Sequence, residues 1–117
     1  GRVGTGAAAT LPPQLPQQLR QALVSLMPKC EATLEHAAHL LAIAPRSLQR
    51  RLEQSGVSFQ QILDDVRREL ACVYLKDRSM SMLDCALLLG YAEQSSFSRA
   101  FSSWFGETPR AWRKRHA

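Results

Sequence analysis

Two stretches of the sequence place polar side chains where one face of a helix could form hydrogen bonds with a partner. Both follow the spacing of three and four residues that brings side chains together on an α-helix. Arginine can donate two hydrogen bonds to guanine, glutamine can pair with adenine, and serine is small enough to let a helix approach the bases. The sequence therefore predicts two base-reading faces for the major groove of DNA. Their residues are Arg46, Gln49 and Arg50 in the first face, and Gln94, Ser95, Ser98 and Arg99 in the second.

The opposite side of each of these helices is apolar. At about 100° per residue, Leu48 and Leu52 lie on the side of the first helix that faces away from its arginines. Phe97, Phe101 and Trp104 take the same place in the second helix. Any solvated helix face is polar, so one such face would be weak evidence for DNA reading. Two faces with an arginine at matching positions favour DNA reading more strongly.

Positive charge is concentrated near these two faces. The chain has 15 Lys and Arg residues against 10 Asp and Glu residues, a formal net charge of +5, and a sequence pI of about 9.6. The excess lies in residues 44–58 and 99–117 and favours a polyanionic partner. Basic and short polar side chains around the reading faces are expected to bind DNA phosphates, which adds affinity that falls with salt. The expected phosphate contacts are Ser47, Arg51, Ser102, Arg110 and Arg113.

Residue types with catalytic or metal-binding chemistry do not form a site in the sequence. Cys30, Cys72 and Cys85 are far apart without a C-x-x-C motif, which argues against a zinc site or a disulfide framework and favours a reducing cytoplasm. His36 and His39 lie one helical turn apart, but no carboxylate or thiol pair completes a ligand set. Paired catalytic carboxylates and a supported Ser/His/Asp arrangement are also missing. The sequence predicts no metal, no cofactor and no enzymatic activity.

Helical periodicity and capping residues divide the chain into about seven helices. Thr33, Ser58 and Ser81 are placed to cap helix N-termini, the last two within capping boxes, and Gly56 and Gly90 are placed to end helices. With 45% hydrophobic residues and no apolar run near the ~18 residues that cross a bilayer, the composition is that of a globular protein. The expected helices span about 16–27, 34–41, 45–55, 59–77, 82–89, 93–105 and 109–117.

Two short helix pairs repeat one another along the chain. When residues 34–52 are laid over residues 82–101, Ala38 matches Ala86 and Ala42 matches Gly90, with one extra residue in the second copy. Each copy is a helix-turn-helix unit. The helix expected at 59–77 joins the two units and is about 27 Å long. The residues of its apolar face are Phe59, Ile62, Leu63, Val66, Leu70, Val73 and Tyr74.

The predicted fold is all-α, with two helix-turn-helix subdomains joined by a long central helix. Residues 1–15 have the Gly, Ala and Pro content of a flexible linker. The first subdomain is expected at 16–58, the connecting helix at 59–78, and the second subdomain, with its basic terminal helix, at 79–117. A chain that opens in a linker without an initiator methionine is expected to be a fragment of a longer protein.

Several sequence motifs, together with the PRSLQRRL run at 45–52, are typical of one family of proteins. From about Gln18 to Arg115 the chain resembles the DNA-binding domain of the AraC/XylS family of bacterial transcription regulators. The motifs are Arg67-x-x-x-Ala71-x-x-x-Leu75, Ala86-x-x-x-Gly90-Tyr91, the SFSRAF run at 96–101, and Gly106-x-Thr108-Pro109-x-x-Trp112-Arg113.

The resemblance implies sequence-specific binding of double-stranded DNA. The two recognition helices of such proteins enter successive major-groove segments on one face of the duplex, about 34 Å apart. Position by position, the family's base-reading sites fall on the two faces already named. The resemblance also implies a transcription activator in the bacterial cytoplasm, associated with the nucleoid, that contacts RNA polymerase. An effector, if the protein has one, would bind a domain absent from this chain.

Three features of the sequence depart from the family pattern. The family often has glycine where this chain has Ala42, so a left-handed residue there is expected to be strained. Many members have serine or aspartate before each recognition helix, whereas the expected N-cap residues here are Ala44 and Ala92. Both recognition helices are therefore expected to fray at their N-termini without DNA. Ser102 and Ser103 stand at positions that are often basic.

Two other functions are compatible with parts of the sequence. A helical protein-interaction module could use its basic helices to bind an acidic partner, although such an interface would not need the same polar face twice. Domains of this kind also occur fused in alkylation-repair methyltransferases that use metal-bound cysteines. This chain has three cysteines and therefore lacks the quartet that such an enzyme uses.

Overall fold

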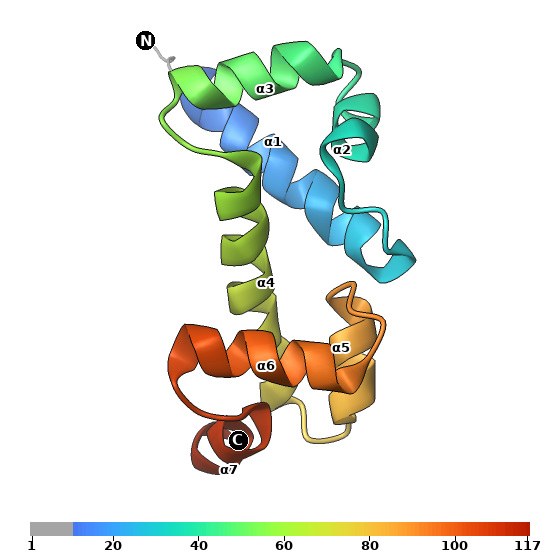
Figure 1. The fold of residues 1–117 in the computed structure, drawn as a ribbon, viewed down its shortest axis with the longest axis vertical. Coiled ribbons are helices and arrows are strands. Elements are labelled where there is room, and N and C mark those ends of the chain that lie inside the picture. Colours follow the sequence, from blue (N-terminus) through green and yellow to red (C-terminus); the bar gives the residue numbers. More distant parts are fainter. Residues whose placement is uncertain (1–10) are drawn as a thin grey trace, which may run out of the picture.

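The computed structural model describes residues 11–117, which fold into seven α-helices and one short 3₁₀ helix without a β-strand (Figure 1). The predicted all-α architecture with about seven helices is confirmed. In this range no helix is both long and apolar enough to span a bilayer. The helices are α1 (Leu11–Leu26), η1 (Met27–Lys29), α2 (Leu34–Leu40), α3 (Pro45–Gln54), α4 (Phe59–Lys76), α5 (Met82–Leu88), α6 (Gln94–Phe105) and α7 (Pro109–His116).

The molecule is elongated because α4 runs between two groups of helices. Its principal extents are 46, 31 and 23 Å. Figure 1 shows α1, α2 and α3 around the first half of α4, and α5, α6 and α7 around the second half. Each group contains one helix-turn-helix pair, α2 with α3 and α5 with α6. The central helix therefore contributes to the cores of both groups.

Four helices begin with a hydroxyl side chain that accepts a hydrogen bond from the backbone N–H three residues later. In α4 the cap is reciprocal, because the Gln61 side chain also accepts from the N–H of Ser58 at 2.8 Å, and the predicted capping box is confirmed. A cap of this kind typically contributes about 1 kcal/mol. The four capping hydroxyls are those of Thr33 (α2, 3.2 Å), Ser58 (α4, 3.1 Å), Ser81 (α5, 3.0 Å) and Thr108 (α7, 3.1 Å).

The turns of the two helix-turn-helix pairs have the same backbone hydrogen bonds. The N–H of Ile43 bonds to the carbonyl of Ala38, and the N–H of Tyr91 bonds to the carbonyl of Ala86, both at 3.0 Å. Bonds of this type satisfy carbonyls that a helix leaves unpaired at its C-terminus. The two copies identified in the sequence therefore turn in the same way.

Each turn passes through one left-handed residue, Ala42 with φ 60° in the first and Gly90 with φ 90° in the second. Alanine in this conformation costs about 1 to 2 kcal/mol, so the strain expected at Ala42 is present in the structure. Gly90 is required for a second reason. A Cβ atom on it would lie 3.1 Å from the carbonyl oxygen of Met27 and 3.3 Å from an Nη atom of Arg67.

The apolar face of α4 changes direction halfway along the helix. Ile62, Leu63 and Val66 are buried as predicted, but Ala71 and Leu75 are the buried residues of the second half. These two sets lie roughly 150° apart around the helix. The predicted single stripe was wrong at Val73, which is 61% exposed. A single stripe assumes one partner, whereas α1 packs against α4 on one side and α5 and α7 pack on another.

The first helix begins at Leu11, earlier than the predicted start near Pro16. Prolines fit the first turn of a helix because the N–H groups there have no partner within the helix. Pro16 lies further inside and removes a single hydrogen bond from α1. Most of the linker predicted at 1–15 lies outside the described residues.

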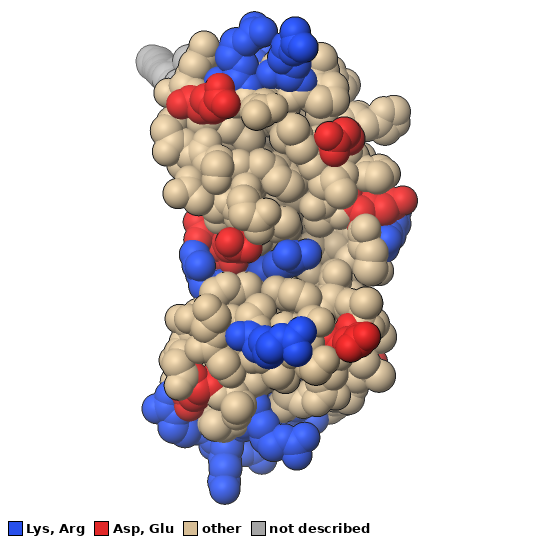
Figure 2. Space-filling model, in the orientation of Figure 1, with Lys and Arg blue, Asp and Glu red and all other residues tan. Residues whose placement is uncertain are grey.

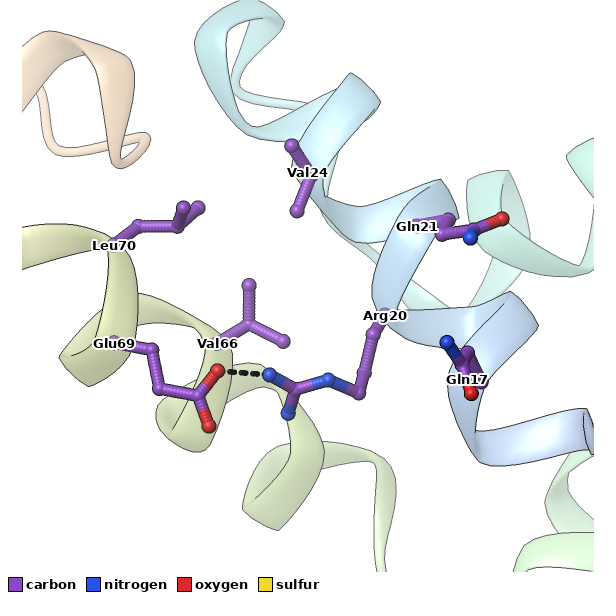
Figure 3. A pocket seen from close by; sticks show the side chains of 7 residues that line it. All are labelled: Gln17, Arg20, Gln21, Val24, Val66, Glu69 and Leu70. Atoms are coloured by element: carbon purple, nitrogen blue, oxygen red, sulfur yellow. Dashed lines mark hydrogen bonds and ion pairs between the residues drawn. The ribbon is translucent and has the colours of Figure 1, made fainter. Parts of the chain in front are cut away.

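An ion pair joins α1 to α4 at their exposed edge. Arg20 of α1 donates to the carboxylate of Glu69 on α4, above a shallow depression lined by Val24, Val66 and Leu70 (Figure 3). Because both charged side chains are partly exposed, the pair contributes at most about 1 kcal/mol. The leucines of α1 that are fully buried in the common core hold the two helices together more strongly.

The contacts of Gly90 make a stability prediction. We expect Gly56→Ala to destabilise the fold by about 1 to 2 kcal/mol, because alanine is strained at the φ of 81° that Gly56 adopts. The space around the Cβ position is open, so no steric clash is added. Gly90→Ala adds a steric clash with backbone and should cost a further ~1 to 3 kcal/mol. Urea unfolding of the two variants measures both free energies. Equal losses would show that the contact of Gly90 with Met27 is relaxed in solution.

Candidate nucleic-acid interface

The structure places the seven predicted base-reading residues at the surface of α3 and α6. Leu48 and Leu52 of α3, and Phe97 and Phe101 of α6, are at most 1% exposed and hold the opposite faces in the core. Six of the reading residues are exposed, and Ser98 is half-buried. In Figure 1 both helices run across the molecule, α3 beside the start of α4 and α6 beside its end. Their N-termini lie on the side of α2 and α5.

The positive charge of the surface is unequal between the two recognition helices. Figure 2 shows lysine and arginine side chains gathered over α3 at one end of the molecule and over α7 at the other. Arg46, Arg50 and Arg51 project from α3, whereas α6 carries Arg99 as its one arginine. In the part of the chain that the structure describes, these four arginines and Arg110 of α7 form no ion pair with an acidic residue. Their guanidinium groups are open to an external anion.

The two recognition helices lack the side-chain N-cap that α2, α4, α5 and α7 have. The N-cap of α3 is Ala44, as predicted, and it has no side-chain acceptor. The prediction of Ala92 as the N-cap of α6 was wrong by one residue, because α6 begins at Gln94 and Glu93 is its N-cap. The Glu93 carboxylate does not accept from the backbone of α6. The first N–H groups of both helices therefore face outward without a side-chain acceptor.

Glu93 is a residue of this surface that the sequence analysis missed. Its carboxylate is exposed and accepts a hydrogen bond from the Ser95 hydroxyl at 3.3 Å, beside Gln94. A carboxylate at this place can accept from the N4 amino group of cytosine and repels phosphate. The signal in the sequence is an acidic residue directly before the polar set of the second face.

The N-terminus of α7 lies beside the second reading face. Gln94, Ser98 and Arg110 line one surface depression together with Thr108 and Pro109. The predicted phosphate residue Arg110 is thus next to two predicted base-reading residues. Of the remaining predicted phosphate residues, Arg51 is exposed, and Ser47 and Ser102 are half-buried.

Arg113, the other predicted phosphate residue, is half-buried and donates hydrogen bonds within the protein. Its Nε donates to the carbonyl of Leu75 at 2.7 Å, and an Nη donates to the carbonyl of Asp77 at 3.1 Å. An Nη atom also lies 3.8 Å from the Cys85 sulfur. Burial raises the pKa of the Cys85 thiol, and the positive charge of Arg113 opposes that shift. Arg113 therefore caps the C-terminus of α4, where a cation is favourable, and the structure does not support its use for phosphate.

These paired units define the chain as a double helix-turn-helix domain. Comparisons with known proteins support this classification. Residues 36–115 match a family described as "Helix-turn-helix domain". The ornithine utilization regulator of Pseudomonas aeruginosa is 44% identical over 81 residues, 69% of this chain and 24% of that protein. The HTH-type transcriptional regulator VirS of Mycobacterium tuberculosis is 39% identical over 88 residues, 75% of this chain and 26% of that protein. The crystal structure of a DNA-binding transcriptional dual regulator from Escherichia coli K-12 superimposes with a TM-score of 0.76 at 24% identity, covering 86% of this chain and 96% of that chain.

The chain belongs to this helix-turn-helix family, whose members of the AraC type are DNA-binding transcription regulators. The predicted family resemblance is confirmed. The chain spans about a quarter of the length of the two relatives. It corresponds to the helix-turn-helix, DNA-binding part of such proteins.

The missing caps of α3 and α6 make a prediction for the free protein. The amides of Ser47 and Ser96, three residues after the N-caps of α3 and α6, should exchange with solvent faster than those of Gln61 and Asp84, which bond to capping hydroxyls. A cap worth about 1 kcal/mol corresponds to a roughly fivefold difference in exchange once intrinsic rates are corrected. Hydrogen exchange followed by NMR measures all four amides. Equal protection would mean that another group caps the recognition helices.

The contacts of Arg113 predict a structural rather than a DNA-binding defect. Arg113→Ala leaves the carbonyl of Leu75 unpaired and removes one of the two hydrogen bonds to the carbonyl of Asp77, which also accepts from the N–H of Met80. The change should lower the free energy of unfolding by about 1 to 3 kcal/mol. The neighbouring Lys114→Ala removes the same charge from an exposed position and should change stability by less than about 0.5 kcal/mol. Thermal or urea unfolding compares the two variants. An unchanged stability of Arg113→Ala with weaker DNA binding would restore the phosphate role.

Proposed function

We propose that this chain binds double-stranded DNA sequence-specifically by inserting α3 and α6 into two successive major-groove segments. The observation that carries the proposal is that α3 and α6 each carry a polar surface face with Arg and Gln opposite a buried apolar face, and that the α6 face adds serines. A solvated helix needs no particular order of such residues, but base reading needs bidentate donors beside short side chains. The proposed base-reading residues are Arg46, Gln49 and Arg50 in α3, and Gln94, Ser95, Ser98 and Arg99 in α6.

The size of α4 supports the bipartite mode. Its 18 residues give a rod of about 27 Å between the two helix-turn-helix pairs. Successive major-groove segments on one face of a duplex lie about 34 Å apart, and α3 lies beside the start of this rod and α6 beside its end. Because one chain carries both units, it can bind an asymmetric site without dimerising.

The two reading faces should contribute unequally. The three exposed arginines of α3, Arg46, Arg50 and Arg51, supply charge for affinity and bidentate donors for guanine. The α6 face pairs Arg99 with serines and with the carboxylate of Glu93, so it offers less charge. We expect α3 to dominate affinity and α6 to add selectivity, with Glu93 favouring cytosine. Phosphate contacts are assigned to Ser47, Arg51, Ser102 and Arg110.

The cellular role of the protein is proposed from its family. Regulation of transcription follows from membership, and activation through contact with RNA polymerase is supported by the AraC/XylS resemblance. The same resemblance supports action in the bacterial cytoplasm, on the nucleoid. An effector, if the protein has one, acts through a domain outside this chain. In the described part of the chain, no group of three or more His, Cys, Asp or Glu side chains is placed to hold a metal ion.

The experiment that tests the proposed function is selection of duplexes of ~25 base pairs from a random library at near-physiological salt. Two enriched boxes about ten base pairs apart would support reading by both α3 and α6. One enriched box would leave a single reading helix. Salt-sensitive binding without any enriched sequence would refute base reading and favour a module that binds an acidic protein partner.

Neighbouring arginines of α3 provide a matched pair of variants. Arg50→Ala should lose roughly 1 to 3 kcal/mol on the selected duplex and relax the base preference at one position. Arg51→Ala should weaken all sequences alike and reduce the salt slope by about one. Arg99→Ala should act like Arg50→Ala, but in the other box. Affinity titrations over selected and scrambled duplexes measure these losses, and a uniform loss for Arg50→Ala would reassign Arg50 to phosphate.

A further inference from the structure

The guanidinium group of Arg67 binds the turn of the second helix-turn-helix pair. Arg67 lies in the middle of α4, and its Nε donates to the carbonyl of Leu89 at 3.0 Å, at the C-terminus of α5. The centre of the guanidinium lies 4.9 Å from the centre of the Tyr91 ring. An Nη atom is also only 3.3 Å from the position that a Cβ atom of Gly90 would take. One side chain thus contacts three successive residues of the turn.

The same turn touches the first group of helices. The carbonyl oxygen of Met27, the first residue of η1, lies 3.1 Å from the Cβ position of Gly90. The Cys30 thiol lies 3.9 Å from the carbonyl oxygen of Gly90. Figure 1 shows the loop between α5 and α6 next to the chain that follows α1. The turn is therefore held between α4 and η1, and it joins the second unit to the first.

This junction determines where α6 lies relative to α3. Tyr91 follows the glycine directly and packs against Phe97 of α6, with ring centres 6.0 Å apart. Burial raises the pKa of the Tyr91 phenol, and the charge of Arg67 opposes that shift. A displacement of the turn would carry α6 and its reading face with it. The length of α4 sets the separation of the two units, and the junction adds to the packing of α5 and α7 on α4 in fixing their rotation about α4.

We propose that Arg67 is a positioning residue that restricts the protein to one spacing between its two DNA boxes. This inference rests on the proposed bipartite reading. Adding one base pair between the boxes moves the second box by about 3.4 Å and rotates it by roughly 35°. A rigid pair of units cannot follow both changes and loses contacts in one groove. A pair released at the Arg67 junction can rotate about the end of α4 and keep both sets of contacts.

Arg68 provides the matched control for this proposal. It is the next residue of the same helix, carries the same charge, and pairs with Asp65 on α4 itself instead of binding the turn. Arg67→Ala and Arg68→Ala therefore remove equal charge from α4, but only the first variant opens the junction. An effect on overall stability alone would not change the preference for one spacing over another.

The test uses the duplex selected by the unmodified chain and four derivatives with one or two base pairs added or removed between the boxes. The unmodified chain and Arg68→Ala should bind the derivatives with a single inserted or deleted base pair about tenfold more weakly, or worse, since at least one base contact is lost. Arg67→Ala should show less than about a threefold penalty. Arg67→Lys, which keeps one donor and the charge, should lie between these values.

Thermal melting curves of every variant show whether binding is measured on folded protein. If Arg67→Ala does not fold, Arg67→Lys takes its place in the comparison of spacings. Equal spacing penalties for Arg67 variants and the unmodified chain would overturn the positioning role while leaving bipartite reading intact. If no duplex is enriched in the initial selection, the proposed function fails, and the positioning role fails with it.

Discussion

The close approach of the Gly90 turn to Met27 and Arg67 is the contact on which the arrangement of the two units depends. Only a glycine fits there, because a Cβ atom would meet backbone on one side and a guanidinium group on the other. The interaction connects η1, α4 and the turn after α5 at one point. It adds a direct contact between the two units to the packing that each unit makes on α4.

The repeated units show how one backbone turn can serve different constraints. The first turn has the same hydrogen bonds as the second, yet it tolerates Ala42 at a left-handed position. The Ala42 side chain is exposed, so its Cβ meets no packed neighbour, and the cost is only local backbone strain. The turn at Gly90 is packed against other elements and has no such freedom. The sequence similarity between the two copies therefore reflects their shared turn geometry. Gly90 in the second copy reflects a tertiary contact that the first copy lacks.

Local signals in the sequence were sufficient for the helices and their faces, but not for contacts between distant elements. The capping box at Ser58 and the buried leucines and phenylalanines of α3 and α6 follow from spacing alone. Val73 could not be predicted, because its burial depends on which side of α4 the second unit covers. The internal hydrogen bonds of Arg113 could not be predicted for the same reason. Its carbonyl partners at Leu75 and Asp77 are far away in the sequence and become neighbours only when α7 packs on α4.

The internal arginines change how the charge of this protein should be interpreted. Arg67 and Arg113 use their donors on the C-terminal carbonyls of α5 and α4, where the helix dipoles favour a cation. Other arginines pair with carboxylates, as Arg68 does with Asp65 and Arg115 with Glu107. The net charge of +5 therefore does not by itself indicate the affinity for a polyanion, because the arginines differ in what they contact. Among residues 11–117, the exposed arginines without a partner in the protein lie on α3, on α6 and at the start of α7, which agrees with the proposed binding to two adjacent grooves of DNA.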